Sequence, residues 1–200
     1  MSKIVRAFVT LMFVALSAYS QTPGQSRCTL TEATSPNVRG LRLGMSTDQL
    51  LALFPGSTKR KEITEALAKA KTATSSEPLY LSLDPARDAV KDHFAGVDSV
   101  SAGLLNGRVV DFGAVYVGAA WTIDAWVAKL SESFGLPPLS AWVPGPSESP
   151  NRVLTCDGVV IEAATQGGSA SIRIRNTEAL KGNEDQVNAA QEKRRRETKP

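Results

Sequence analysis

One histidine, His93, would have to serve any Ser-His-Asp or Cys-His site in this chain of 200 residues. Its surroundings, AVKDHFAGV, match no catalytic motif, and the chain has no Gly-x-Ser-x-Gly, no Ser-x-x-Lys and no glycine-rich phosphate loop. We therefore expect His93 to be an exposed or half-buried residue without a catalytic role, and we expect the protein not to be an enzyme.

A pair of carboxylates is the remaining kind of catalytic site to consider, since a glycosidase needs two acids that face one another across the substrate. Asp98, Asp111 and Glu162 fall on segments that are expected to be strands. The solvated face of a sheet explains acids at such positions equally well. A small envelope hydrolase that uses paired carboxylates is therefore kept as the alternative function.

Three tryptophans, Trp121, Trp126 and Trp142, lie within 22 residues of one another. Trp126 falls on the apolar face of an expected helix and is assigned to the core. Trp142 lies in a proline-rich loop, LPPLSAWVPGPSESPN, and such a stiffened loop loses less entropy on binding. Because tryptophan is enriched at interface hot spots, Trp121 and Trp142 are the predicted binding residues.

The first 20 residues have the features of a secretory signal peptide. Lys3 and Arg6 are followed by an apolar run from Ala7 to Ala18, and Ala18-Tyr19-Ser20 fits the small-x-small rule for cleavage before the next residue. The run is shorter than the roughly 20 residues that span a bilayer. We expect a secreted or periplasmic protein with no transmembrane span.

Two cysteines, Cys28 and Cys156, could pair or bind a metal. Neither a CxxC nor an HxxxH spacing is present, and one histidine does not complete a four-ligand zinc site. An oxidising compartment favours pairing. We predict a Cys28–Cys156 disulfide, no metal site and no cofactor.

Without the first 20 residues the chain has 21 basic and 20 acidic residues, which gives no support for nucleic-acid binding. Residues 21–37 have no periodicity and are expected to be a flexible N-terminal segment. Residues 178–200 are poor in core residues and include the basic run Lys193–Arg196, so they are expected to form a charged tail that is disordered or loosely helical. That run could make a weak contact with an anionic surface. A single domain is expected over 38–177.

Helix and strand signals alternate within this domain. Three helices are expected: one after Ser46, one over 59–71 and one after Thr122. Ser46 and Gln49 form a capping box at the start of the first. Strands are expected at 79–83, on both sides of Asn106-Gly107 and of Asp157-Gly158, and at 169–176. Residues 84–96 could be a short helix capped by Asp84 or a loop.

A capped helix followed by an antiparallel hairpin occurs twice, in halves of about 41–117 and 121–176. Helices that each have one apolar face pack naturally on one face of an antiparallel sheet. The sequence therefore predicts an α+β fold: a largely antiparallel sheet of hairpins with two to four helices on one face, and a possible tandem helix-plus-hairpin repeat.

The stretch Gly44-Met45-Ser46-Thr47-Asp48-Gln49-Leu50, with a Pro-Gly helix exit and hairpins after it, resembles a module of small bacterial envelope proteins. These are the outer-membrane assembly lipoproteins of the SmpA/OmlA type and the two-repeat β-lactamase-inhibitor-protein-like fold. The chain differs from the lipoproteins because no cysteine follows the expected cleavage point, and it carries an insertion over 57–77.

The resemblance implies a protein that binds other proteins and has no chemistry of its own. We therefore expect an exported, non-enzymatic protein-binding module of the cell envelope, inhibitor-like or assembly-factor-like. The expected partner is another envelope protein, bound through a face of the sheet or through the loop that is rich in tryptophan and proline.

Overall fold

The computed structural model describes residues 28–72, 77–90, 92–118, 121–146 and 150–197. The expected signal peptide lies outside the described residues, as do residues 21–27 of the expected flexible segment. The described part contains five α-helices, two short 3₁₀ helices and seven strands. The helices are α1 (Thr47–Leu53), η1 (Pro55–Lys59), α2 (Lys61–Thr72), α3 (Pro85–Asp88), α4 (Ile123–Phe134), η2 (Leu139–Ala141) and α5 (Thr177–Glu197).

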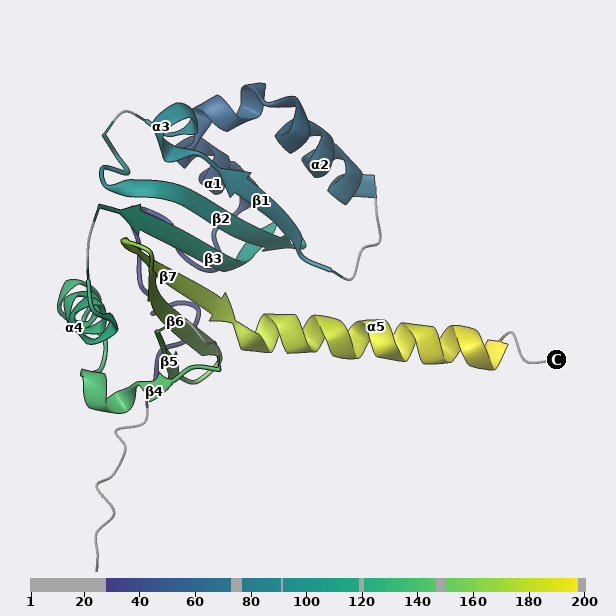
Figure 1. Cartoon of the computed structure of the whole chain (residues 1–200). Coiled ribbons are helices and arrows are strands. Elements are labelled where there is room, and N and C mark those ends of the chain that lie inside the picture. Colours follow the sequence, from purple (N-terminus) through teal and green to yellow (C-terminus); the bar gives the residue numbers. More distant parts are fainter. Residues whose placement is uncertain (1–27, 73–76, 91, 119–120, 147–149, 198–200) are drawn as a thin grey trace, which may run out of the picture.

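The strands form one antiparallel sheet in the order β1-β2-β3-β7-β6-β5-β4, which confirms the predicted α+β class (Figure 1). Their bounds are β1 (Leu79–Leu83), β2 (Val97–Leu105), β3 (Arg108–Val117), β4 (Val143–Pro144), β5 (Asn151–Thr155), β6 (Val159–Gln166) and β7 (Ser169–Asn176). Strands β1 to β3 come from the first half of the chain and β5 to β7 from the second. The halves therefore join through their last strands, β3 and β7, and the order reads the same from either end apart from the two-residue strand β4.

Turn chemistry explains the β2–β3 hairpin. Asn106 and Gly107 connect the strands with φ of 51° and 74°, the left-handed conformation that a two-residue type I′ turn requires. Asn and Gly are the residues that adopt it with least strain. The turn sets Leu104 opposite Val109, and a register shift between Gly103 and Leu104 then places Asp111 opposite Gly103.

Side-chain caps begin the two main helices at the predicted residues. The Ser46 hydroxyl accepts a hydrogen bond from the Gln49 backbone N–H, and the Gln49 side chain accepts one from the Ser46 N–H, which completes the capping box. The Thr122 hydroxyl accepts from the Ala125 N–H at the start of α4, and Gly135 ends that helix with φ of 63°. Residues 84–96 contain both structures considered: the short helix α3, capped by Asp84, and a loop after it.

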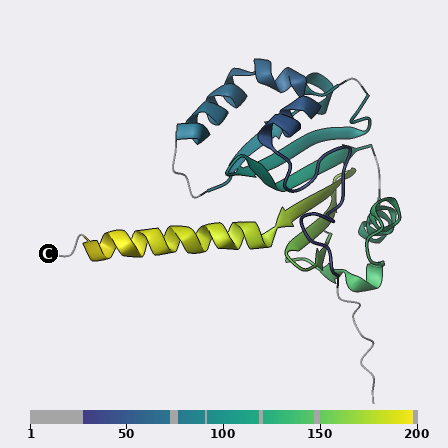
Figure 2. The same cartoon turned by 180° about the vertical axis from the view of Figure 1, so that it is seen from behind.

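One face of the sheet is covered and apolar. Phe112 on β3, Ile161 on β6, and Ile172 and Ile174 on β7 are each at most 1 % exposed. Helix α1 contacts β3, α3 contacts β2, and α4 packs on β5 and β6. Figure 2 shows α1 and the N-terminal segment in front of the strands, whereas in Figure 1 strands β1 to β3 have no helix in front of them. We call the uncovered side the open face.

The predicted disulfide is present. Cys28 and Cys156 are bonded, their Cα atoms are 4.5 Å apart, and the loop that they close spans 128 residues. The bond ties the N-terminal segment to the turn between β5 and β6. Cys28 and Pro36 are buried, so the segment that precedes residue 38 packs against the domain at these two residues. The segment predicted to be flexible is thus attached to the domain within 28–37, and its composition does not reveal these contacts.

Helix α5 continues directly from β7 and extends away from the sheet, over the segment for which the sequence predicts a disordered or loosely helical tail (Figures 1 and 2). Its start is capped by Asn176, whose side-chain oxygen accepts from the Ala179 N–H at 2.9 Å. The segment is also rich in Ala, Glu, Gln, Lys and Arg, which have high helix propensity. Among the residues that the structure describes, none of the helices has the length and apolar character that a membrane span requires.

Candidate binding surfaces

A buried carboxylate lies at the centre of the open face. Asp111 on β3 is 1 % exposed, although its side chain points away from the helices. Arg173 on β7 donates to it twice, from Nε at 3.0 Å and from Nη2 at 2.5 Å, and the Tyr80 hydroxyl on β1 donates at 3.2 Å. The hydrogen bond to Asp111 raises the pKa of Arg173. Burial, and then the Asp111 charge, raise the pKa of Tyr80.

Two glycines make room for this arrangement. A Cβ at Gly103 would lie 2.9 Å from Cε1 of Tyr80, so the tyrosine ring lies over the bare backbone of β2. A Cβ at Gly113 would lie 3.8 Å from Cγ of Arg173 and 3.1 Å from the Ser101 hydroxyl. The side chains above these glycines cover Asp111, which explains how a charged residue on an uncovered face is buried.

A second ion pair lies beside the first. Arg175 on β7 donates to Glu162 on β6 at 3.3 Å. In the strand register Glu162 lies opposite Arg173, and Asp111 lies opposite Arg175, so both pairs form diagonally. Tyr80, Asp111, Arg173, Glu162 and Arg175 therefore make a continuous polar band across β1, β3, β7 and β6, which we call the open-face band.

The band does not supply the paired carboxylates of the alternative function. Asp111 and Glu162 lie on strands that β7 separates, and the register sets them two positions apart along the strands, so their backbones are more than about 10 Å apart. Asp111 is fixed by the guanidinium fork of Arg173, and Glu162 is paired with Arg175 through a single nitrogen. Asp98, at the start of β2, lines a different cavity together with Asp84. The structure does not bring the three acids together.

The two predicted binding tryptophans have different environments. Trp142 is 5 % exposed, belongs to the main hydrophobic core, and donates its indole N–H to the Pro137 carbonyl at 3.1 Å. Its assignment as a contact residue does not agree with this burial, because the side chain fills the space beneath the loop instead of projecting from it. Part of that loop, 147–149, lies outside the described residues. Trp121 is 38 % exposed and lines a cavity.

That cavity, of about 430 Å³, lies between α4, the end of β3 and the turn at 38–40. Tyr116 and Trp126 form its wall, with ring centroids 5.1 Å apart, and the Trp121 ring centroid is 6.4 Å from that of Trp126. The Trp126 indole donates to the Ser171 carbonyl at 2.8 Å, which fixes the ring. Burial raises the pKa of Tyr116. Sequence analysis missed Tyr116, since one tyrosine near a strand end carries no signal by itself.

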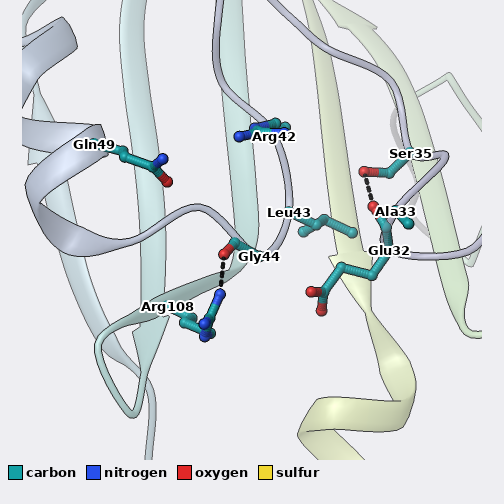
Figure 3. A pocket seen from close by; sticks show the side chains of 8 residues that line it. All are labelled: Glu32, Ala33, Ser35, Arg42, Leu43, Gly44, Gln49 and Arg108. Atoms are coloured by element: carbon teal, nitrogen blue, oxygen red, sulfur yellow. Dashed lines mark hydrogen bonds between the residues drawn. The ribbon is translucent and has the colours of Figure 1, made fainter.

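A polar cavity of about 320 Å³ lies at the glycines that precede α1. Figure 3 shows Arg108 approaching Gly44, whose carbonyl accepts from Nη1 at 2.9 Å, while Glu32 approaches from the other side. Asn176 already donates to the Glu32 carboxylate. A Cβ at Gly44 would overlap Glu32, so this glycine permits a close structural contact. We assign the cavity to packing between the N-terminal segment and the sheet.

His93 has a structural contact. Its Nε2 lies 2.8 Å from the carbonyl oxygen of Arg39 and donates to it. The ring also meets Phe94 edge-on, with centroids 4.9 Å apart. Within the described ranges, no three His, Cys, Asp or Glu residues come close enough to hold a metal ion.

Comparison of the chain with models of known protein families, with curated proteins and with solved structures finds no match.

Proposed function

We propose that this chain is an exported, non-enzymatic protein-binding module of the bacterial cell envelope, inhibitor-like or assembly-factor-like, that binds another envelope protein through the open face of its sheet. The observation that carries the proposal is the open-face band. Tyr80, 54 % exposed, and Arg173 are held in place by the buried Asp111, on a face that none of the helices in the described part of the chain covers.

Tyrosine and arginine are the residue types enriched at interface hot spots. Their side chains lose less entropy on binding when they are already held in one orientation. Asp111 supplies that restraint, since it binds both Tyr80 and Arg173. Val143, 50 % exposed, pairs with Val153 at the far edge of the same sheet and adds apolar surface.

Three further observations support export and binding. The leader pattern of residues 1–20 is typical of secretion, and the Cys28–Cys156 disulfide is typical of an oxidising compartment. The capped segment from Gly44 to Leu50 resembles envelope modules that bind proteins. The proposed localisation is therefore periplasmic or secreted.

Site-specific photo-crosslinking tests the proposal. A benzoylphenylalanine in place of Tyr80 is expected to crosslink one dominant envelope protein in the producing bacterium. The same group in place of Val90, which is 55 % exposed but lies outside the sheet, is the matched control. Arg173→Gln is expected to remove the crosslink from position 80, because the band loses its charged donor. Equal crosslinking from positions 80 and 90, or none from position 80, would contradict the proposal.

A further inference from the structure

The aromatic cavity beside α4 lies on the other side of the sheet from the open-face band. Along β3 the side chains alternate, so Tyr116 points to the same side as the buried Phe112 and Ala114. The cavity is bounded by Tyr116, Trp121 and Trp126, and we call it the Trp121 pocket. The binding function proposed for the open face does not use it.

The aromatic residues that line the pocket are held in place by contacts with the rest of the domain. Trp126 is 3 % exposed, and its indole N–H is bonded to the Ser171 carbonyl. Trp121 directly precedes Thr122, the residue that caps α4, so the backbone beside its ring is anchored. Rings arranged at angles of 42° and 60° around a half-open space suit a planar apolar group.

Two cations line the pocket, Arg39 and Lys129. Lys129 Nζ lies 5.3 Å from the Trp121 ring centroid, and Arg39 donates to the Ala95 carbonyl at 3.1 Å. Neither forms an ion pair with a carboxylate anywhere in the part of the chain that the structure describes. An apolar pocket with two cations that lack an acidic partner is complementary to an apolar anion.

Arg39 also occupies a position that arginine rarely takes. Its φ is 55° and that of Gly40 is 90°, at the centre of a turn in which Val38 and Leu41 exchange backbone hydrogen bonds. Asn or Gly is the usual residue in such a turn. An arginine in a left-handed conformation beside a pocket is the kind of local strain that accompanies functional sites.

We propose that the Trp121 pocket binds a small aromatic carboxylate, with its ring against Tyr116, Trp121 and Trp126 and its carboxylate between Arg39 and Lys129. The cavity volume of about 430 Å³ lies within the range of small-ligand sites. Carboxylate bound by lysine and arginine in a partly dry pocket forms charge-assisted hydrogen bonds, which supply the selectivity for an anion over a neutral analogue.

Titration of ¹⁵N-labelled protein with indole-3-acetate, and with indole-3-acetamide as its neutral analogue, tests this proposal by NMR. The three indole N–H signals separate the sites, and Trp121→Phe assigns one of them. We expect saturable shifts at Trp121 and Trp126 with Trp142 unmoved, and a Kd about tenfold lower for the acid than for the amide.

Arg39→Asn and Lys129→Gln are each expected to reduce the preference for the acid. Asn tolerates the left-handed backbone at position 39, so that variant keeps the turn. Lys181→Gln, which removes a cation on α5 far from the pocket, is the matched control and is expected to change nothing.

Equal affinities for acid and amide, shifts that map away from the pocket, or no saturation at about 10 mM would each overturn the proposal. The crosslinking result at Tyr80 does not bear on this one, because the two sites lie on opposite faces of the sheet.

Discussion

Arg173 forms its two hydrogen bonds with Asp111, although the residue directly opposite Arg173 on β3 is Gly113. The guanidinium group therefore reaches diagonally along the neighbouring strand, over a glycine that leaves the path clear. The strand on the other side offers Glu162 directly opposite, and that acid pairs with Arg175 instead. This crossed pairing links three strands of the sheet from the two halves of the chain.

The buried member of these pairs is expected to contribute more to stability than the exposed one. Asp111→Ala removes the acceptor of Tyr80 and Arg173 and is expected to lower the free energy of unfolding by about 2 kcal/mol. Glu162→Ala is expected to lower it by less than about 1 kcal/mol, because both partners of that ion pair are partly exposed. Urea unfolding followed by tryptophan fluorescence measures both, and equal losses would contradict the assignment of Asp111 as the centre of the band.

The disulfide is expected to be fully formed and strongly stabilising. Thiol titration of the denatured, unreduced protein should find no free cysteine from Cys28 or Cys156. A loop of 128 residues corresponds to about 4–5 kcal/mol in the chain-entropy treatment of a cross-link. The Cys28→Ser, Cys156→Ser double variant should therefore show a much lower urea midpoint. Two titratable thiols, or an unchanged midpoint, would be inconsistent with the structure.

Truncation of the two non-helical tryptophans is expected to destabilise the protein to very different extents. Trp142→Ala should lower the free energy of unfolding by about 3–5 kcal/mol, because it opens a cavity in the core. Trp121→Ala should lower it by less than about 1 kcal/mol, since this ring is partly exposed. Thermal unfolding of the two variants makes the comparison, and a stable Trp142→Ala protein would restore that residue as a possible contact.

Acid is expected to destabilise the α2–α3 region through Asp88. Its side chain is fully buried and bonded to Arg60 Nη1 at 2.7 Å. Burial would raise the pKa of Asp88, but the Asp84 backbone N–H and the Arg60 guanidinium together hold it below its usual 3.8. A folded-state pKa below the unfolded value contributes stability that is present above about pH 4 and is lost as the pH falls through the folded pKa.

The free energy of unfolding, measured by urea titration at pH 6, 4 and 3, checks this expectation. Asp88→Asn should have a lower free energy of unfolding at pH 6 and should lose less of it between pH 6 and pH 3. The reason is that the variant lacks the group whose pKa changes on unfolding. If the free energy of unfolding falls equally between pH 6 and pH 3 in Asp88→Asn and in the wild type, another carboxylate causes the acid sensitivity.

Local signals in the sequence predicted most of the elements. Ser46 and Gln49 satisfy the free N–H groups at the start of α1 from three residues away, and Asn106-Gly107 adopts left-handed dihedrals that few other pairs tolerate. The strand predicted at 169–176 is present as β7, in which buried residues alternate with more exposed ones. These features depend on neighbours along the chain, so sequence alone determines them.

The candidate sites depend on contacts between distant residues. Nothing near Tyr80 in the chain indicates that it lies over Gly103 and bonds to Asp111, and nothing near Trp142 shows that it is buried. Arg39 and Lys129 line one pocket across 90 positions of the chain. Sequence by itself predicted most of the elements, the disulfide and the class of fold. Only the tertiary structure decided which charged side chains form ion pairs and which aromatic rings remain exposed. Both depend on the register of the strands and on the face of the sheet that each helix covers.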